Sequence, residues 1–156
     1  MIYTVRFCHL EKMAIYGNGD SVKKGDIIGR MGSTGASSAN HLHIDLVQTA
    51  DESVYHLGDI MENVSDLKKL LLQYHYFLDS DLFKYKLHIT SFFGDPDYLD
   101  GNGVWKFHPA YDVVPENRHI TKANFDIYWN RTADGVVLST GFDKAYGNYI
   151  NIAYKG

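Results

Sequence analysis

The sequence predicts a mainly β protein of antiparallel strands, with a single helix between two β-rich segments. The chain has 14 Gly and 12 Tyr but only 3 Pro, a balance that suits short strands joined by glycine turns. Alternating apolar residues occur near both ends of the chain. The middle stretch, 50–86, has almost no glycine and contains one apolar pattern of helical spacing, at about 65–79.

The elements follow in a simple order, and the length of 156 residues predicts one domain. We divide the chain into a first β-rich block (1–49), a helical connector (50–86) and a second β-rich block (87–156). The expected elements are strands at 2–7 and 41–47, a helix at about 65–79 capped by Ser65 or Asp66, and strands at 134–139 and 148–154.

Composition excludes several classes of protein. The net charge of −4 argues against a nucleic-acid binder, which normally carries a basic patch. No apolar run approaches the ~20 residues that cross a bilayer, so no membrane span is predicted. The first residues lack the basic and apolar regions of a signal peptide, and none is predicted. Cys8 stands alone, which excludes an internal disulfide and favours a small buried residue.

Four of the 8 histidines occur in patterns that can carry chemistry. His41 and His43 are two residues apart on a predicted strand, so both imidazoles face the same side. Pro109 disfavours a helical state for His108, which predicts a loop that leads into a strand and places Asp112 nearby. His9 ends the first strand. Catalytic zinc takes three ligands from His, Asp or Glu, and further imidazoles can act as general bases.

The remaining histidines are expected at structural or surface positions. They are His56, His75, His88 and His119.

Five segments resemble one known family, the lysostaphin/LytM-type zinc endopeptidases. Residues 19–43 are similar to the family's run G-x-x-V-x-x-G-D-x-I-G-x-x-G-x-T-G, which leads into H-L-H, and residues 3–10 resemble its Y-x-H-L strand. The other three segments resemble I-T-S-x-F-G at 89–94, H-x-G-x-D at 108–112, and D-G-x-V followed by Y-G-N-x-V-x-I from 134 onward. The resemblance covers 1–49 and 87–156.

The resemblance implies roles for particular residues. His43, His108 and Asp112 would hold Zn²⁺, and His9 and His41 would flank the metal as the catalytic pair. A tyrosine often assists in this family; Tyr98 is the first candidate and Tyr111 the second. The implied fold is the antiparallel sheet or sandwich of these peptidases, which is similar to a barrel-sandwich hybrid.

The implied function is hydrolysis of the peptide cross-links of bacterial peptidoglycan. That substrate places the protein outside the cell or facing the cell wall. A phage lysin or a tail-associated phage enzyme fits a chain in which no signal peptide is visible. The implied partners are peptidoglycan peptide stems and cross-bridges.

The order of the segments is reversed relative to the family, which resembles a circular permutation. The family's second half comes first here, and 50–86 would join the old termini. Termini that lie close together at an exposed turn tolerate such a change. We therefore expect the strand at 148–154 to pair antiparallel with the strand at 2–8. The alternative is a strand-exchanged dimer, in which one chain's first block completes another chain's last block.

Three positions depart from the family pattern, and two other functions compete. Ala110 stands where the family has Gly, Ser38-Ala39-Asn40 replaces the usual Gly before H-L-H, and Asp95-Pro96 replaces an Arg.

The first competing function is a non-catalytic domain of the same fold that binds cell wall or a partner protein. The second is a lipoyl or biotin carrier modified at Lys144, but that lysine lies more than a hundred residues after the Gly25-Asp26 turn.

Overall fold

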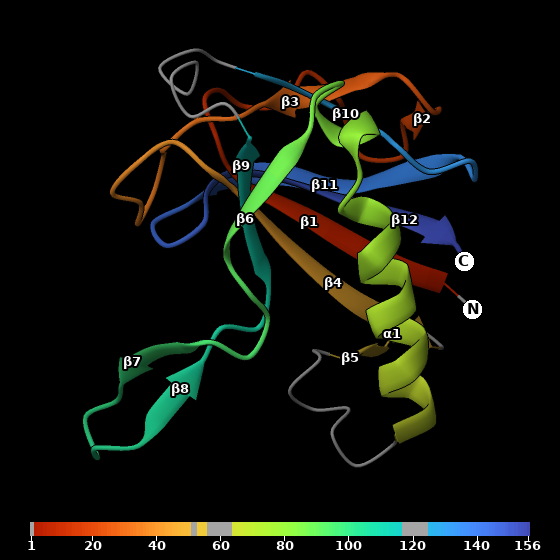
Figure 1. Ribbon diagram of the computed structural model, residues 1–156. Helices are drawn as coiled ribbons and strands as arrows, with labels where there is room; N and C mark the ends of the chain where they lie inside the picture. Colours follow the sequence, from red (N-terminus) through yellow and green to blue (C-terminus); the bar gives the residue numbers. More distant parts are fainter. Residues whose placement is uncertain (1, 51–52, 56–63, 117–124) are drawn as a thin grey trace.

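The computed structural model describes residues 2–50, 53–55, 64–116 and 125–156. Within these ranges the chain forms one large antiparallel sheet, two small two-stranded sheets and one α-helix (Figure 1). The large sheet is an open path from one edge strand to the other and does not close into a barrel. The predicted mainly β fold is therefore confirmed.

The large sheet takes strands from both ends of the chain. Its order is β2 (Ser21–Val22), β11 (Gly135–Asp143), β12 (Gly147–Lys155), β1 (Ile2–Leu10), β4 (Leu42–Ala50), β9 (Tyr111–Pro115) and β6 (Leu87–Ser91), and β5 (Ser53–Tyr55) pairs with β4. The small sheets pair β3 (Ile27–Arg30) with β10 (Asp126–Tyr128), and β7 (Pro96–Leu99) with β8 (Trp105–Phe107). The 3-10 turn η2 (Ser80–Leu82) follows the helix.

The helix α1 (Val64–Phe77) agrees with the expected 65–79 to within two residues. It crosses one face of the large sheet in Figure 1, and it contacts β4. Among its residues with described side chains, Leu70, Tyr74 and Phe77 are buried in the core, and they recur at helical spacing on one side. The first part of the connector, 56–63, lies outside the described residues, and so does His56.

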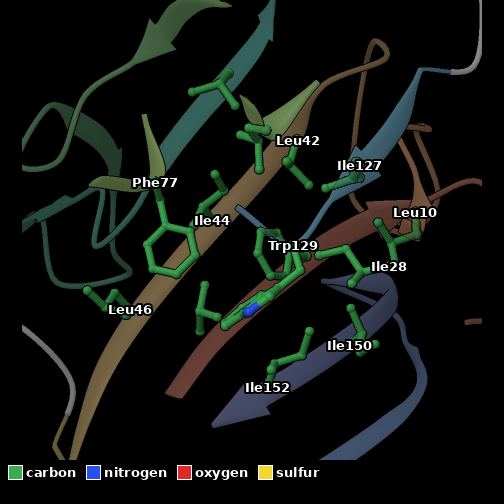
Figure 2. Packing of buried hydrophobic residues seen from close by; sticks show 14 of the residues in the cluster. Leu10, Ile28, Leu42, Ile44, Leu46, Phe77, Ile127, Trp129, Ile150 and Ile152 are labelled. Carbon is green, nitrogen blue, oxygen red and sulfur yellow. The ribbon is translucent and has the colours of Figure 1, made fainter. Parts of the chain in front are cut away.

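Alternation along the strands gives the sheet two different faces. On β4, Leu42, Ile44 and Leu46 are fully or almost fully buried and pack toward Phe77 and Trp129 (Figure 2). Burying each such side chain contributes about 1.5–3 kcal/mol. The residues between them point to the opposite face, which carries the polar groups discussed below.

The two ends of the chain lie side by side, as the sequence predicts (Figure 1). β1 and β12 are antiparallel neighbours, and their register pairs Ile2 with Lys155 and Phe7 with Ile150. The expected pairing of 148–154 with 2–8 is therefore confirmed within a single chain. In the described part of the chain, no helix has the length and apolar character needed to cross a membrane.

Candidate metal centre and catalytic histidines

Three predicted metal ligands meet on the polar face of the sheet. His43 on β4 and Asp112 on β9 are paired residues of adjacent strands, so their side chains project together. His108 lies in the loop before β9. The His43 Nδ1 is 2.9 Å from the Asp112 Oδ1, and the His108 Nε2 is 3.4 Å and 3.5 Å from these two atoms. All three ligand atoms lie within 4.8 Å of one another.

The electrostatics of this cluster depend on two imidazoles beside one carboxylate. Burial lowers the pKa of His43, but hydrogen bonds to Asp112 and Asp45 outweigh burial and raise the pKa to about 9. The pKa of His108 is also raised, because its interaction with Asp112 outweighs burial. Burial alone would raise the pKa of Asp112, yet hydrogen bonds from His108 and His43 bring it far below its usual range. The carboxylate is therefore ionised at neutral pH.

This set of donors fits a divalent metal ion such as zinc. Two imidazole nitrogens and one carboxylate oxygen converge on a common point, which is the donor set that leaves a catalytic zinc site open. The other nitrogen of His108, Nδ1, lies 3.0 Å from the Ser91 Oγ. Such a contact fixes the orientation of a ligating ring. The arrangement thus supplies both ligands and support for them.

A second group, Cys8, His43 and Asp45, also brings three possible ligand atoms within 4.8 Å. It fits a metal less well. Burial raises the pKa of the Cys8 thiol far above its ordinary value, so the thiolate that a metal requires is disfavoured. Asp45 is already paired with Arg6, whose Nη2 is 2.6 Å from its Oδ2.

His41 and His9 flank the cluster, and backbone carbonyls orient both rings in the same way. The Nδ1–H of His41 donates to the Ala39 carbonyl oxygen (2.8 Å), and that of His9 donates to the Thr34 carbonyl oxygen (2.7 Å). These hydrogen bonds engage Nδ1 and leave the Nε2 of each ring available to a substrate or a water molecule. The His41 Nε2 is 3.7 Å from the Asp112 Oδ1. The ring centroids of His9 and His41 lie 4.8 Å apart.

A distortion of β1 places His9 in the site. Simple alternation would direct His9 to the core face together with Phe7. Instead the register shifts between Phe7 and Leu10, and His9 has a φ of 61°. This left-handed conformation costs a non-glycine residue on the order of 1–3 kcal/mol and is typical of functional sites. As a result Leu10 is fully buried, and the His9 ring lies 5.7 Å from that of His43.

A pocket of about 400 Å³ opens beside these histidines. It is lined by Ser38, Ala39, Asn40, His41, Thr90, Ser91, Asp112 and Val114. Segment 38–40, where the chain departs from the family pattern, therefore forms one wall. The other lining residues, apart from His41, come from β6 and β9. A chain segment bound in this pocket would contact both His41 and Asp112.

The two tyrosine candidates lie elsewhere. Tyr98 is on β7 and is 56% exposed, in a hairpin that extends away from the large sheet (Figure 1). Among the described residues, no hydrogen bond or ring contact joins it to the histidines. Tyr111 faces the core, where its ring centroid lies 5.2 Å from that of Tyr74. The structure brings neither phenol to the metal cluster.

The other histidines do not join the site. His75 on α1 and His88 on β6 are exposed, and neither contacts the proposed ligands in the described part of the chain. His119 lies outside the described residues, as His56 does.

Two residues of the site were missed by sequence reasoning. Asp45 follows His43 by two positions, so alternation alone places it on the same face, and the pattern H-x-H-x-D was a usable signal. Arg6 is paired with Asp45 in the register of β1 and β4, which the sequence does not reveal.

Comparison with known proteins identifies one part of the chain. Residues 2–54 match the family model described as Peptidase family M23. This segment contains His9, His41 and His43. No curated protein and no solved structure matches the chain.

Proposed function

The chain carries an M23 peptidase segment at residues 2–54, and from this premise we propose that it is a zinc-dependent endopeptidase that hydrolyses the peptide cross-links of bacterial peptidoglycan. One observation carries the proposal. The M23 segment supplies His43, and the rest of the chain supplies His108 and Asp112, whose donor atoms converge on the same point. Neither segment has this donor set alone.

The ligands we assign are the His43 Nδ1, the His108 Nε2 and a carboxylate oxygen of Asp112. When bound there, zinc would polarise the scissile carbonyl and lower the pKa of a water molecule toward ~7. The imidazoles of His9 and His41 would carry out the proton transfer and stabilise the negative oxygen, and the pocket beside His41 would bind the peptide.

We assign the general base to His9. Burial lowers the pKa of His9 below its ordinary value, so its ring is neutral at neutral pH. Since its Nδ1–H donates to Thr34, its Nε2 is free to accept the proton of the attacking water. When the carbon–nitrogen bond breaks, this proton passes to the leaving amine.

We assign oxyanion stabilisation to His41. Its Nε2 lies 3.7 Å from the Asp112 Oδ1, so this ring nitrogen is beside the proposed ligands. In this role an N–H at Nε2 donates to the oxygen that becomes negative as water attacks the carbonyl carbon. The products are a carboxylic acid and an amine.

The site of action follows from the substrate. Because the cross-links lie in the cell wall, we place the enzyme's activity there, on peptide stems and cross-bridges.

The test compares the wild type with His43→Ala, with His88→Ala as a matched control on the exposed side of β6. Bound zinc is counted, and clearing is measured on walls with glycine-rich and with direct cross-links. We expect one zinc per chain and clearing in the wild type and the control, and the loss of both in His43→Ala. Unchanged zinc content in His43→Ala would overturn the ligand assignment. Stoichiometric zinc without cleavage of any wall would indicate a non-catalytic binding domain.

We also propose that the chain is a circular permutant of the M23 arrangement. The support is the antiparallel pairing of β12 with β1, which ends at Ile2 and Lys155. In the ordinary order a short turn would join these two strands. A variant with that turn added and with a new opening between 56 and 63 should bind zinc and clear walls as the wild type does. A variant that folds but binds no zinc would contradict the permutation.

A further inference from the structure

A buried ion pair lies directly behind the proposed ligand His43. Asp45 is only 6% exposed, and one of its oxygens, Oδ2, receives three contacts. Arg6 donates to it from Nη2 (2.6 Å) and from Nε (3.1 Å), and the His43 Nε2 lies 3.1 Å away. Burial of a carboxylate at this depth is costly unless its charge is paired and hydrogen-bonded, as it is here.

Arg6 is itself held on two sides. The register of β1 and β4 places it opposite Asp45, and its guanidinium carbon lies 3.9 Å from the centroid of the Tyr146 ring. A guanidinium group combines a planar pair of donors with favourable stacking on an aromatic face, which a lysine does not reproduce. Both contacts therefore restrict the position of the Asp45 oxygen.

The position of that oxygen decides which nitrogen of His43 is available to a metal. The two ring nitrogens face opposite ways: Nε2 faces Asp45, and Nδ1 faces Asp112 and His108. If Nε2 keeps its proton for Asp45, the lone pair is on Nδ1, where the other two ligand atoms converge. A ligating histidine that donates its second N–H to a carboxylate is oriented and made more basic.

We propose that Arg6 and Asp45 are positioning residues for the metal centre, which fix the ring of His43 so that Nδ1 is its ligating atom. This inference rests on the proposed metal site. Among the described residues, no hydrogen bond or ion pair joins Arg6 or Asp45 to the other two proposed ligands, and neither residue lines the pocket beside His41. Its effect therefore reaches the metal only through His43.

A purely structural ion pair is the competing explanation, and a double substitution separates the two. Arg6→Met with Asp45→Leu removes both charges of the pair together, and His43 keeps its hydrogen bond to Asp112. Replacement of a buried ion pair by apolar residues of similar size is often neutral or stabilising for folding. The same substitution removes the acceptor of the His43 Nε2–H. Folding stability and metal affinity should therefore respond differently.

The experiment measures zinc affinity by competition with a chromophoric chelator and, separately, urea unfolding of the metal-free proteins. The matched control is Arg30→Met with Asp126→Leu, which removes the exposed ion pair between β3 and β10. We expect the Arg6/Asp45 double variant to bind zinc about 10–100-fold more weakly than the wild type, and the control to bind as the wild type does. The ring ¹⁵N shifts of zinc-loaded wild type should show His43 ligated through Nδ1 and protonated at Nε2.

Each outcome has a defined meaning. Wild-type zinc affinity in a folded Arg6/Asp45 double variant would overturn the positioning role while leaving the proposed function intact. A wild-type protein that binds no zinc would overturn the proposed function and this inference together. If the double variant does not fold, Asp45→Ala decides instead. It removes the acceptor of the His43 Nε2–H, and unchanged zinc affinity in that variant would refute the proposal.

Discussion

Removal of the metal should make the stability of the fold depend on pH through His43. In the metal-free protein, both ring nitrogens of His43 face carboxylates, and hydrogen bonds to Asp112 and Asp45 outweigh burial and raise its pKa to about 9. Its ordinary value is 6.5. A proton held more tightly by the folded than by the unfolded chain stabilises the fold.

The difference between the folded and the ordinary pKa of His43 fixes the sign and size of the change in unfolding free energy with pH. The stabilisation is fully present below pH 6.5 and is lost as the pH rises through 9. The step from 6.5 to about 9 corresponds to about 3 kcal/mol of unfolding free energy. His108, whose pKa is also raised, adds in the same direction, whereas the lowered pKa of His9 acts below pH 6.5.

The assay is urea unfolding in the presence of a chelator at several pH values between 6 and 9.5. The metal-free wild type and the control His88→Gln should lose about 3 kcal/mol over this range. His43→Gln should lose much less. Saturating zinc should abolish the loss, because the metal and the proton compete for the same nitrogen. A flat stability profile for the metal-free wild type would refute the reasoning, and so would an equal loss in His43→Gln.

Three further predictions concern other parts of the site. Tyr74→Phe should lower the unfolding free energy, measured by urea titration, by about 1–3 kcal/mol. The reason is that the buried hydroxyl accepts from the Leu46 N–H and donates to the Pro109 carbonyl oxygen. The control is Tyr76→Phe at an exposed position, and an equal effect there would contradict the prediction. His9→Ala should reduce kcat on purified walls by 10²–10⁴-fold with unchanged zinc content, and near wild-type kcat would exclude His9 as the base. Gly147→Ala should lower the melting temperature and the wall-clearing rate, because Gly147 has a φ of 65° and an added Cβ would clash with the carbonyl oxygen of Thr34, which orients His9. The left-handed conformation alone costs about 1–2 kcal/mol. The control is Gly101→Ala, whose added Cβ meets nothing within 4 Å, and it should change neither quantity.

Local sequence patterns were sufficient to predict the position of a residue where its neighbours in sequence decide its environment. The alternation of His41, Leu42, His43 and Ile44 assigns two residues to the site face and two to the core, and the structure has this arrangement in β4 and in His41 just before it. The helix was predictable for the same reason, because Leu70, Tyr74 and Phe77 already mark its buried side. The proposed ligand His108 was also predictable as a loop residue, since proline restricts the residue before it.

Other features depend on strand pairing and on local breaks in the pattern. No sequence rule places Arg6 beside Asp45, because that contact depends on the register of β1 against β4. The position of His9 contradicts simple alternation and exists because a left-handed residue reverses the two faces of β1. The choice of Tyr98 relied on the family alone, and the structure places that residue on an exposed hairpin.

The sequence by itself determined the chemical groups: three predicted metal ligands, two further imidazoles and the strands that present them. It also predicted that 148–154 lies beside 2–8, because the reversed order of the segments relative to the family implies that pairing. Only the tertiary structure decided how the groups are oriented. The direction of an imidazole depends on hydrogen bonds from residues distant in sequence, here the Thr34 carbonyl for His9 and Asp45 with Arg6 for His43, and such contacts exist only once the strands are in register.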